Sequence, residues 1–212
     1  METFPLPPKE TPARGFTLIE TMVAMLVLCV GLVALGSLAA QSLNGTSRSR
    51  FAAVAADLAT EKLEDLSRWP VFDAANNVAD PNIYAASGTT VGSLTSDTSA
   101  TVTSGGIPAE LVNYYDDVEF SDSNGAISET VSQVAGGTTS YKTTSHNPDG
   151  TITTSTSTSS TAADANAIGF HRRWTIEMDQ PVTGLRRITV LVTLQNSYMN
   201  PPVSFQMTMV RP

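Results

Sequence analysis

The sequence predicts an α+β fold in which a long N-terminal α-helix packs on a C-terminal antiparallel β-sheet. Two patterns in the 212 residues lead to this prediction. A mostly apolar run and an amphipathic stretch with helical spacing together extend from residue 16 to residue 69. Near the other end, three segments alternate apolar and polar residues, as strands with one covered face do. The amphipathic half of the helix is the natural cover for that face.

The apolar part of the predicted helix is long enough to cross a membrane. Residues 16–40 read FTLIETMVAMLVLCVGLVALGSLAA and would be about 37 Å long as a helix, against a bilayer core of about 30 Å. A secretory signal peptide has a shorter apolar core, and here a polar leader comes first. Lys9 and Arg14 weakly favour a cytoplasmic leader, although Arg48 and Arg50 lie on the far side.

Glu20 is the one carboxylate within this apolar run. A charge at such a depth costs about 2.5–3.5 kcal/mol on insertion scales, so it requires a partner and marks a functional position. An ordinary single-pass anchor would explain the length of the run but not this residue.

The residues around Glu20 resemble a known leader. Residues 15–20, GFTLIE, followed by an apolar helix, are similar to the class III leader of type IV pilins and type II secretion pseudopilins. The resemblance implies that a prepilin peptidase cleaves between Gly15 and Phe16 on the cytoplasmic side and methylates the new amine of Phe16. It also implies a pilin fold, and pairing of Glu20 with the N-terminal amine of a neighbouring subunit during assembly. Such pairing relieves the cost of each charge alone, and pairing within one subunit before assembly stays open.

The resemblance divides the chain into five parts. Residues 1–15 are the leader, and residues 16–44 are the half of the long helix that lies in the membrane or the filament core. Residues 45–70 are the amphipathic half, residues 71–163 a variable Ser/Thr-rich region of loops and a hairpin, and residues 164–212 the C-terminal antiparallel sheet.

The amphipathic half is expected to bury one face and expose the other. The apolar face comprises Phe51, Val54, Ala55, Leu58, Leu63 and Leu66, and the charged face comprises Asp57, Glu61, Glu64, Asp65 and Arg68. Pro70 ends the helix because it disfavours helical conformation at Trp69. Gly31, Gly36 and Gly45 are expected sites of bending or local melting of the helix.

The Ser- and Thr-rich middle of the chain has three notable features. The apolar cluster of residues 107–120 is expected to be ordered and packed near the helix. Asp116, Asp117, Asp122 and Asn124 offer oxygen ligands for calcium, but the absence of EF-hand spacing favours a solvated loop. Residues 141–158 predict a hairpin around an Asn-Pro-Asp-Gly turn; its faces are polar and its register poorly specified, which indicates mobility or an exposed contact surface.

Three strands are expected at the C-terminal end, over residues 168–178, 185–195 and 203–209, as an antiparallel meander. In the first of them, apolar residues share one parity and Arg172 breaks the pattern. The four arginines are expected to form local salt bridges rather than a ligand-binding patch, with Glu177 close to Arg186. These arginines are Arg172, Arg173, Arg186 and Arg187.

Charge and residue usage argue against several functions. The net charge of −8 disfavours non-specific binding of nucleic acid. Cys29 is the one cysteine and lies in the apolar run, so no intrachain disulfide is expected. His146 and His171 are far apart without a Cys-x-x-Cys motif, and no nucleotide loop or hydrolase motif is present. No metal, no cofactor and no enzymatic activity are therefore expected.

Within the pilin family, residues 27–38, residues 59–64 and the arginine–tryptophan strand resemble those of minor pilins. The resemblance predicts a minor pilin that helps to initiate or modify type IV pilus assembly. Its expected partners are prepilin peptidase, other minor and major pilins, the inner-membrane assembly machinery and, before assembly, the lipid bilayer. The chain would be a single-pass inner-membrane protein with a periplasmic or extracellular domain, and part of the pilus after assembly. A type II secretion pseudopilin and a membrane-anchored binding or adhesion module are the alternatives.

Overall fold

The computed structural model describes residues 15, 17–68, 83–102, 110–121, 125–135, 138–159, 167–195, 199 and 201–212. The chain divides into two compact units, residues 1–47 and residues 48–212. Helix α1 (Leu18–Arg68) contributes to both units.

The N-terminal unit contains the first part of α1, and every residue described in it is exposed. Its large apolar side chains include Leu18, 78% exposed, and Val33, 74% exposed. By length and composition, α1 is long and apolar enough to cross a membrane. The helix is continuous through Gly31, Gly36 and Gly45. So much exposed apolar surface is unfavourable in water and calls for lipid or another apolar partner.

The second part of α1 packs through one face, as predicted. Phe51 and Val54 are partly buried, and deeper burial is found at Ala55, Leu58, Ala59, Leu63 and Leu66. The residues predicted for the charged face are exposed: Asp57, Glu61, Glu64, Asp65 and Arg68. The helix ends at Arg68, close to the expected end, while Trp69 and Pro70 lie outside the described residues.

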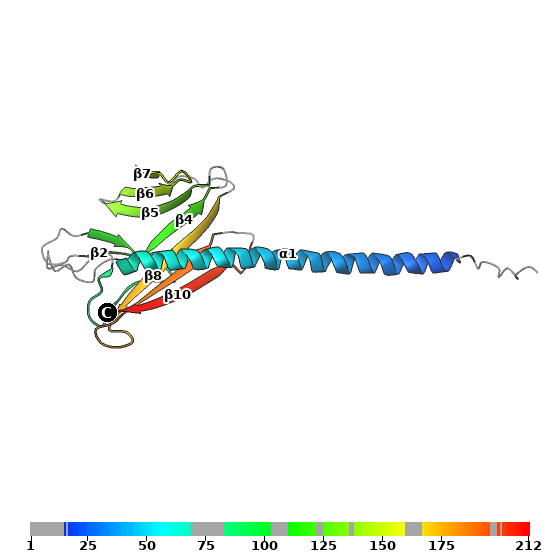
Figure 1. Cartoon of the computed structure of the whole chain (residues 1–212), viewed down its shortest axis with the longest axis horizontal. Coiled ribbons are helices and arrows are strands. Elements are labelled where there is room, and N and C mark those ends of the chain that lie inside the picture. The colour runs from blue at the N-terminus through cyan, green and yellow to red at the C-terminus, as the bar shows by residue number, and fades with distance from the viewer. Residues whose placement is uncertain are drawn as a thin grey trace, which may run out of the picture. The chain divides into compact units, whose positions relative to one another are not determined.

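The described strands form one large antiparallel sheet and one small sheet (Figure 1). The large sheet has the order β10-β9-β8-β4-β5-β6-β7, and β1 pairs with β8. Its strands are β1 (Thr90–Gly92), β4 (Tyr115–Phe120), β5 (Ile127–Ala135), β6 (Thr138–His146), β7 (Ile152–Ser157), β8 (Ile168–Met178), β9 (Arg186–Leu194) and β10 (Ser204–Arg211). The small sheet pairs β2 (Ser99–Val102) with β3 (Glu110–Asn113).

One face of the large sheet forms the core together with the second part of α1. The buried apolar residues alternate along β8 and β9, as the period of two requires. The buried apolar residues of the sheet include Val118, Phe170, Trp174, Ile176, Ile188, Val190 and Val192. Val112 and Tyr114 from the predicted apolar cluster are buried in the same core. The predicted α+β class is therefore confirmed, and the architecture is pilin-like.

Five of the described strands of the middle region, β1 and β4 to β7, belong to the large sheet. The C-terminal meander β8-β9-β10 forms as predicted, but β4, β5, β6 and β7 extend the sheet well upstream of residue 164. The predicted hairpin is confirmed as β6 and β7, paired from Tyr141 with Ser157 to His146 with Ile152. Its register is thus defined, while its mobility stays a prediction.

The structure corrects two expectations. Asp116 and Asp117 lie within strand β4 rather than in a solvated loop. Glu177 pairs with Arg187, at 2.5 Å between Oε2 and Nε, and Arg186 lies opposite Met178. The connection between β8 and β9 is centred on Val182, so the register differs by one residue from the predicted one and Glu177 meets Arg187 instead of Arg186.

Candidate functional site

The predicted processing and assembly residues lie where α1 begins. Gly15 is exposed, Glu20 is exposed in the first helical turn, and Phe16 lies outside the described residues. The amide of Glu20 donates to the carbonyl oxygen of Thr17 at 3.0 Å and to its Oγ1 at 3.3 Å. Thr17 is therefore the N-cap of α1, and Glu20 occupies the third helical position.

The Thr-x-x-Glu spacing of these two residues is that of a capping box, in which a side chain at the third position supports the helix start. A carboxylate in the first turn also interacts favourably with the positive end of the helix dipole. Glu20 thus has a local role at the helix start as well as the predicted role in assembly. The same carboxylate is near the place where cleavage after Gly15 would create a new α-amine.

Comparison with known families gives a match at this segment. The family model described as the prokaryotic N-terminal methylation motif matches residues 11–36, which include Gly15, Phe16 and Glu20. Comparison with curated proteins and with solved structures gives no match to the chain.

The leader is therefore of the prepilin type, and it precedes a pilin-like α+β fold. Together these findings support a pilin or pseudopilin that prepilin peptidase processes, and they are consistent with membrane anchoring through α1. The individual roles of Gly15, Phe16 and Glu20 stay predictions.

A buried ion cluster joins α1 to the large sheet. Asp116 of β4 and Arg172 of β8 are each 1% exposed, and Arg172 donates to both Asp116 oxygens, at 2.6 Å and 2.9 Å. Lys62 Nζ lies 3.0 Å from Asp116 Oδ2 and 4.2 Å from the centre of the Trp174 ring. Arg172 Nη2 also lies 2.8 Å from Glu129 Oε1. Each buried charge is thus compensated by an opposite one.

Electrostatics within this ion cluster favour the charged forms of Asp116 and Arg172. Burial alone would raise the pKa of Asp116, but the adjacent Lys62 and Arg172 outweigh it, and the pKa is lowered. Burial opposes the charge of Arg172 as well, yet Asp116 and Glu129 raise its pKa. The arrangement suits a structural role in which the ion pairs hold the helix on the sheet.

This ion cluster was not predicted, although the sequence contains two signals of it. Arg172 lies on the same face of its strand as the apolar residues Phe170 and Trp174. A charged residue on a buried face requires an anionic partner. Lys62 lies on the helix near the apolar face, four residues after Leu58 and four before Leu66.

The structure also bears on the calcium alternative. The carboxylate of Asp116 is paired with the side chains of Lys62 and Arg172. Asp117, which pairs with His171, faces the opposite side of the sheet because adjacent residues of a strand alternate between its faces. These two carboxylates therefore do not converge on one ion. Asp122 and Asn124 lie outside the described residues. In the described part of the chain, no group of three or more His, Cys, Asp or Glu side chains is arranged to hold a metal ion.

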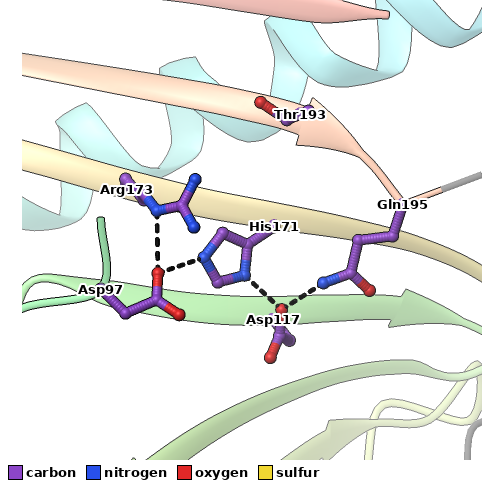
Figure 2. A pocket seen from close by; sticks show the side chains of 6 residues that line it. All are labelled: Asp97, Asp117, His171, Arg173, Thr193 and Gln195. Carbon is purple, nitrogen blue, oxygen red and sulfur yellow. Dashed lines mark hydrogen bonds and ion pairs between the residues drawn. The ribbon is translucent and has the colours of Figure 1, made fainter. Parts of the chain in front are cut away.

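A second polar cluster lies on the sheet face opposite the core, around His171 of β8 (Figure 2). We call it the His171 cluster; it lines an open hollow of about 390 Å³ and comprises Asp97, Asp117, His171, Arg173, Thr193 and Gln195. His171 Nδ1 lies 2.5 Å from Asp117 Oδ1, and its Nε2 lies 2.8 Å from Asp97 Oδ1. Arg173 Nε donates to the same Asp97 oxygen at 2.8 Å, and Gln195 Nε2 donates to Asp117 at 2.6 Å.

Three of the four arginines form the expected local salt bridges, and Arg186 contacts a sulfur instead. Arg172 pairs with Asp116, Arg173 with Asp97, and Arg187 with Glu177. Arg186 is buried on the core face, and its Nε lies 3.3 Å from the sulfur of Met178. The arginines are thus divided between the two faces and engaged locally, which disfavours a common ligand-binding patch.

Proposed function

We propose that this chain is a minor pilin, processed by prepilin peptidase, that takes part in initiating or modifying type IV pilus assembly. The observation that carries the proposal is the prepilin motif at residues 11–36, leading directly into a helix with an exposed apolar surface. The resemblance of residues 27–38 to the minor pilin PilV supports the assignment as a minor pilin. A structural, non-enzymatic subunit accounts for the absence of catalytic motifs from the sequence.

In the proposed mechanism, the leader is on the cytoplasmic side of the inner membrane, and cleavage after Gly15 exposes the amine of Phe16. Methylation keeps the positive charge of that amine. Glu20 of an incoming subunit then pairs with the amine of a neighbour, because both charges are poorly solvated at this depth. The exposed apolar residues of α1 exchange lipid for other pilin helices, and the C-terminal unit lies outside the inner membrane.

Two substitutions of Glu20 separate its charge from its capping role. Glu20→Gln removes the charge but keeps a side chain suited to a capping box, whereas Glu20→Ala removes both. If charge pairing drives assembly, both variants are expected in sheared pili at much lower levels than the parent, with leader cleavage largely intact. Glu61→Ala, on the exposed face of the same helix, is the matched control and should be incorporated normally. Normal incorporation of both Glu20 variants would overturn the proposed role.

A type II secretion pseudopilin is the second candidate, because the N-terminal motif supports both classes. Deletion of the chain in its host separates them: loss of surface pili with normal secretion supports the minor pilin, and the reverse result supports the pseudopilin. A membrane-anchored adhesion module would leave both processes intact.

A further inference from the structure

The two ring nitrogens of His171 face two different carboxylates. Asp117 lies at Nδ1 and Asp97 at Nε2, and both carboxylates accept hydrogen bonds. A neutral imidazole donates from one nitrogen only, while the imidazolium donates from both. The observed arrangement is therefore satisfied only by protonated His171, since neutral His171 would turn a lone pair toward one of the carboxylates.

The charges around His171 also balance when the ring is protonated. The groups that face it from the described elements are Asp97 before β2, Tyr115 and Asp117 of β4, Arg173 of β8, and Gln195 after β9. Two carboxylates and one guanidinium leave one negative charge, which an imidazolium neutralises. The His171 side chain is 12% exposed, so water screens the attraction between its ring and the carboxylates only weakly.

The two carboxylates differ in how firmly the backbone holds them. Asp117 lies within β4 and is paired to both β5 and β8. Asp97 lies in the connection between β1 and β2, where residues 93–96 bond mainly to one another through the hydroxyl of Ser93. This connection is fixed at Gly92, which pairs with Thr175, and at Thr98, whose carbonyl accepts from the Tyr114 amide. Between these two points, the Asp97 side chain connects this segment to β8 through its bonds with His171 and Arg173.

We propose that His171 is a pH-dependent latch: its protonated form holds the connection of residues 93–97 on the sheet face, and loss of the proton releases Asp97 while Asp117 stays bound. Asp117 is retained because Gln195 also donates to it and because Nδ1 of neutral His171 still can. Arg173 then holds Asp97 alone, as an exposed and weaker pair.

The electrostatics of the His171 cluster agree with this geometry. The hydrogen bond to Asp117 raises the pKa of His171 above the ordinary 6.5, burial opposes the shift, and the bond to Asp97 raises the pKa further. Burial would raise the pKa of Asp97, but the bonds from His171 and Arg173 lower it, so Asp97 stays ionised when His171 titrates. The latch is thus fully closed below pH 6.5 and opens as the pH rises through the folded-state pKa of His171.

The first test is an NMR titration of the histidine rings in the full chain in detergent micelles. His146→Gln assigns the His171 signals, because these are the two histidines of the chain. We expect His171 to titrate with a midpoint above 6.5. A midpoint at or below 6.5 would overturn the latch, and this measurement does not depend on any His171 variant folding.

The second test follows hydrogen–deuterium exchange of residues 93–97 on both sides of that midpoint, corrected for the intrinsic pH dependence of exchange. The exchange rate in the parent is expected to rise about threefold to tenfold at the higher pH. This is the change expected from losing the free energy of one partly exposed charged hydrogen bond. His171→Gln and Asp97→Asn should exchange fast at both pH values, and His146→Gln should behave as the parent. Equal protection of the parent at both pH values would refute the proposal.

Discussion

Lys62 of α1 and Asp116 of β4 form an ion pair of 3.0 Å beside the Trp174 ring, and Arg172 of β8 binds the same carboxylate. One buried anion thus connects the helix with two neighbouring strands of the sheet. The apolar face of α1 supplies burial, which is non-directional, whereas this contact fixes which helical turn meets which strand. The ion cluster therefore accounts for the register between helix and sheet in the C-terminal unit.

Asp116→Ala is expected to destabilise the C-terminal unit strongly. The substitution leaves Lys62 and Arg172 without their shared partner, and breaking a buried pair in this way costs about 3–5 kcal/mol. The free energy of unfolding is measured by urea denaturation of the full chain in detergent. The matched control is Glu177→Ala, which removes a partly exposed partner of Arg187 and should cost less than about 1 kcal/mol. Equal losses in the two variants would refute the role of Asp116.

Stability in acid is expected to depend on the same carboxylate. The folded-state pKa of Asp116 is lowered from 3.8, so its contribution is present above that value and is lost as the pH falls through the folded-state pKa. Urea unfolding at a series of acidic pH values should therefore show a flatter profile for Asp116→Asn than for the parent. Parallel profiles would show that Asp116 does not contribute to acid unfolding.

Gly92→Ala is expected to destabilise the junction between β1 and β8. Gly92 has a φ of 81°, and an added Cβ would lie 2.2 Å from the carbonyl oxygen of Trp174. Positive φ alone costs a non-glycine residue roughly 1–2 kcal/mol, and the backbone collision adds to it. Gly88→Ala is the control, because its φ is 68° with nothing within 4 Å of the added Cβ. Urea unfolding should show a clearly larger loss for Gly92→Ala; an equal loss would mean that the collision relaxes without cost.

The periodic parts of the fold were predictable from the sequence. Spacings along residues 51–66 identified the buried face of α1, and alternation along the last strands identified the meander. The pairing of Glu177 was wrong by one residue, because turn length sets the register and composition alone leaves it undefined.

The polar clusters were less accessible to prediction. Arg172 and Lys62 each carried a sequence signal, since a charge at an apolar position calls for a buried partner, but neither signal named Asp116. The His171 cluster carried no such signal: Asp97 is far from His171 in sequence and reaches it because β1 pairs with β8, while Gln195 reaches Asp117 because β8 lies between β4 and β9. Glu20, in contrast, was singled out from local sequence alone, and its role in assembly stays a prediction.

The proposed pilin function depends most directly on the processing of the leader. Its test is mass spectrometry of the mature N-terminus after expression with a prepilin peptidase, with Gly15→Val as the variant in which cleavage should be blocked. We predict that the mature chain begins at an N-methylated Phe16 and that the Gly15 variant keeps its leader. A chain that retains Met1, is cut elsewhere, or is processed equally in the variant would contradict the account.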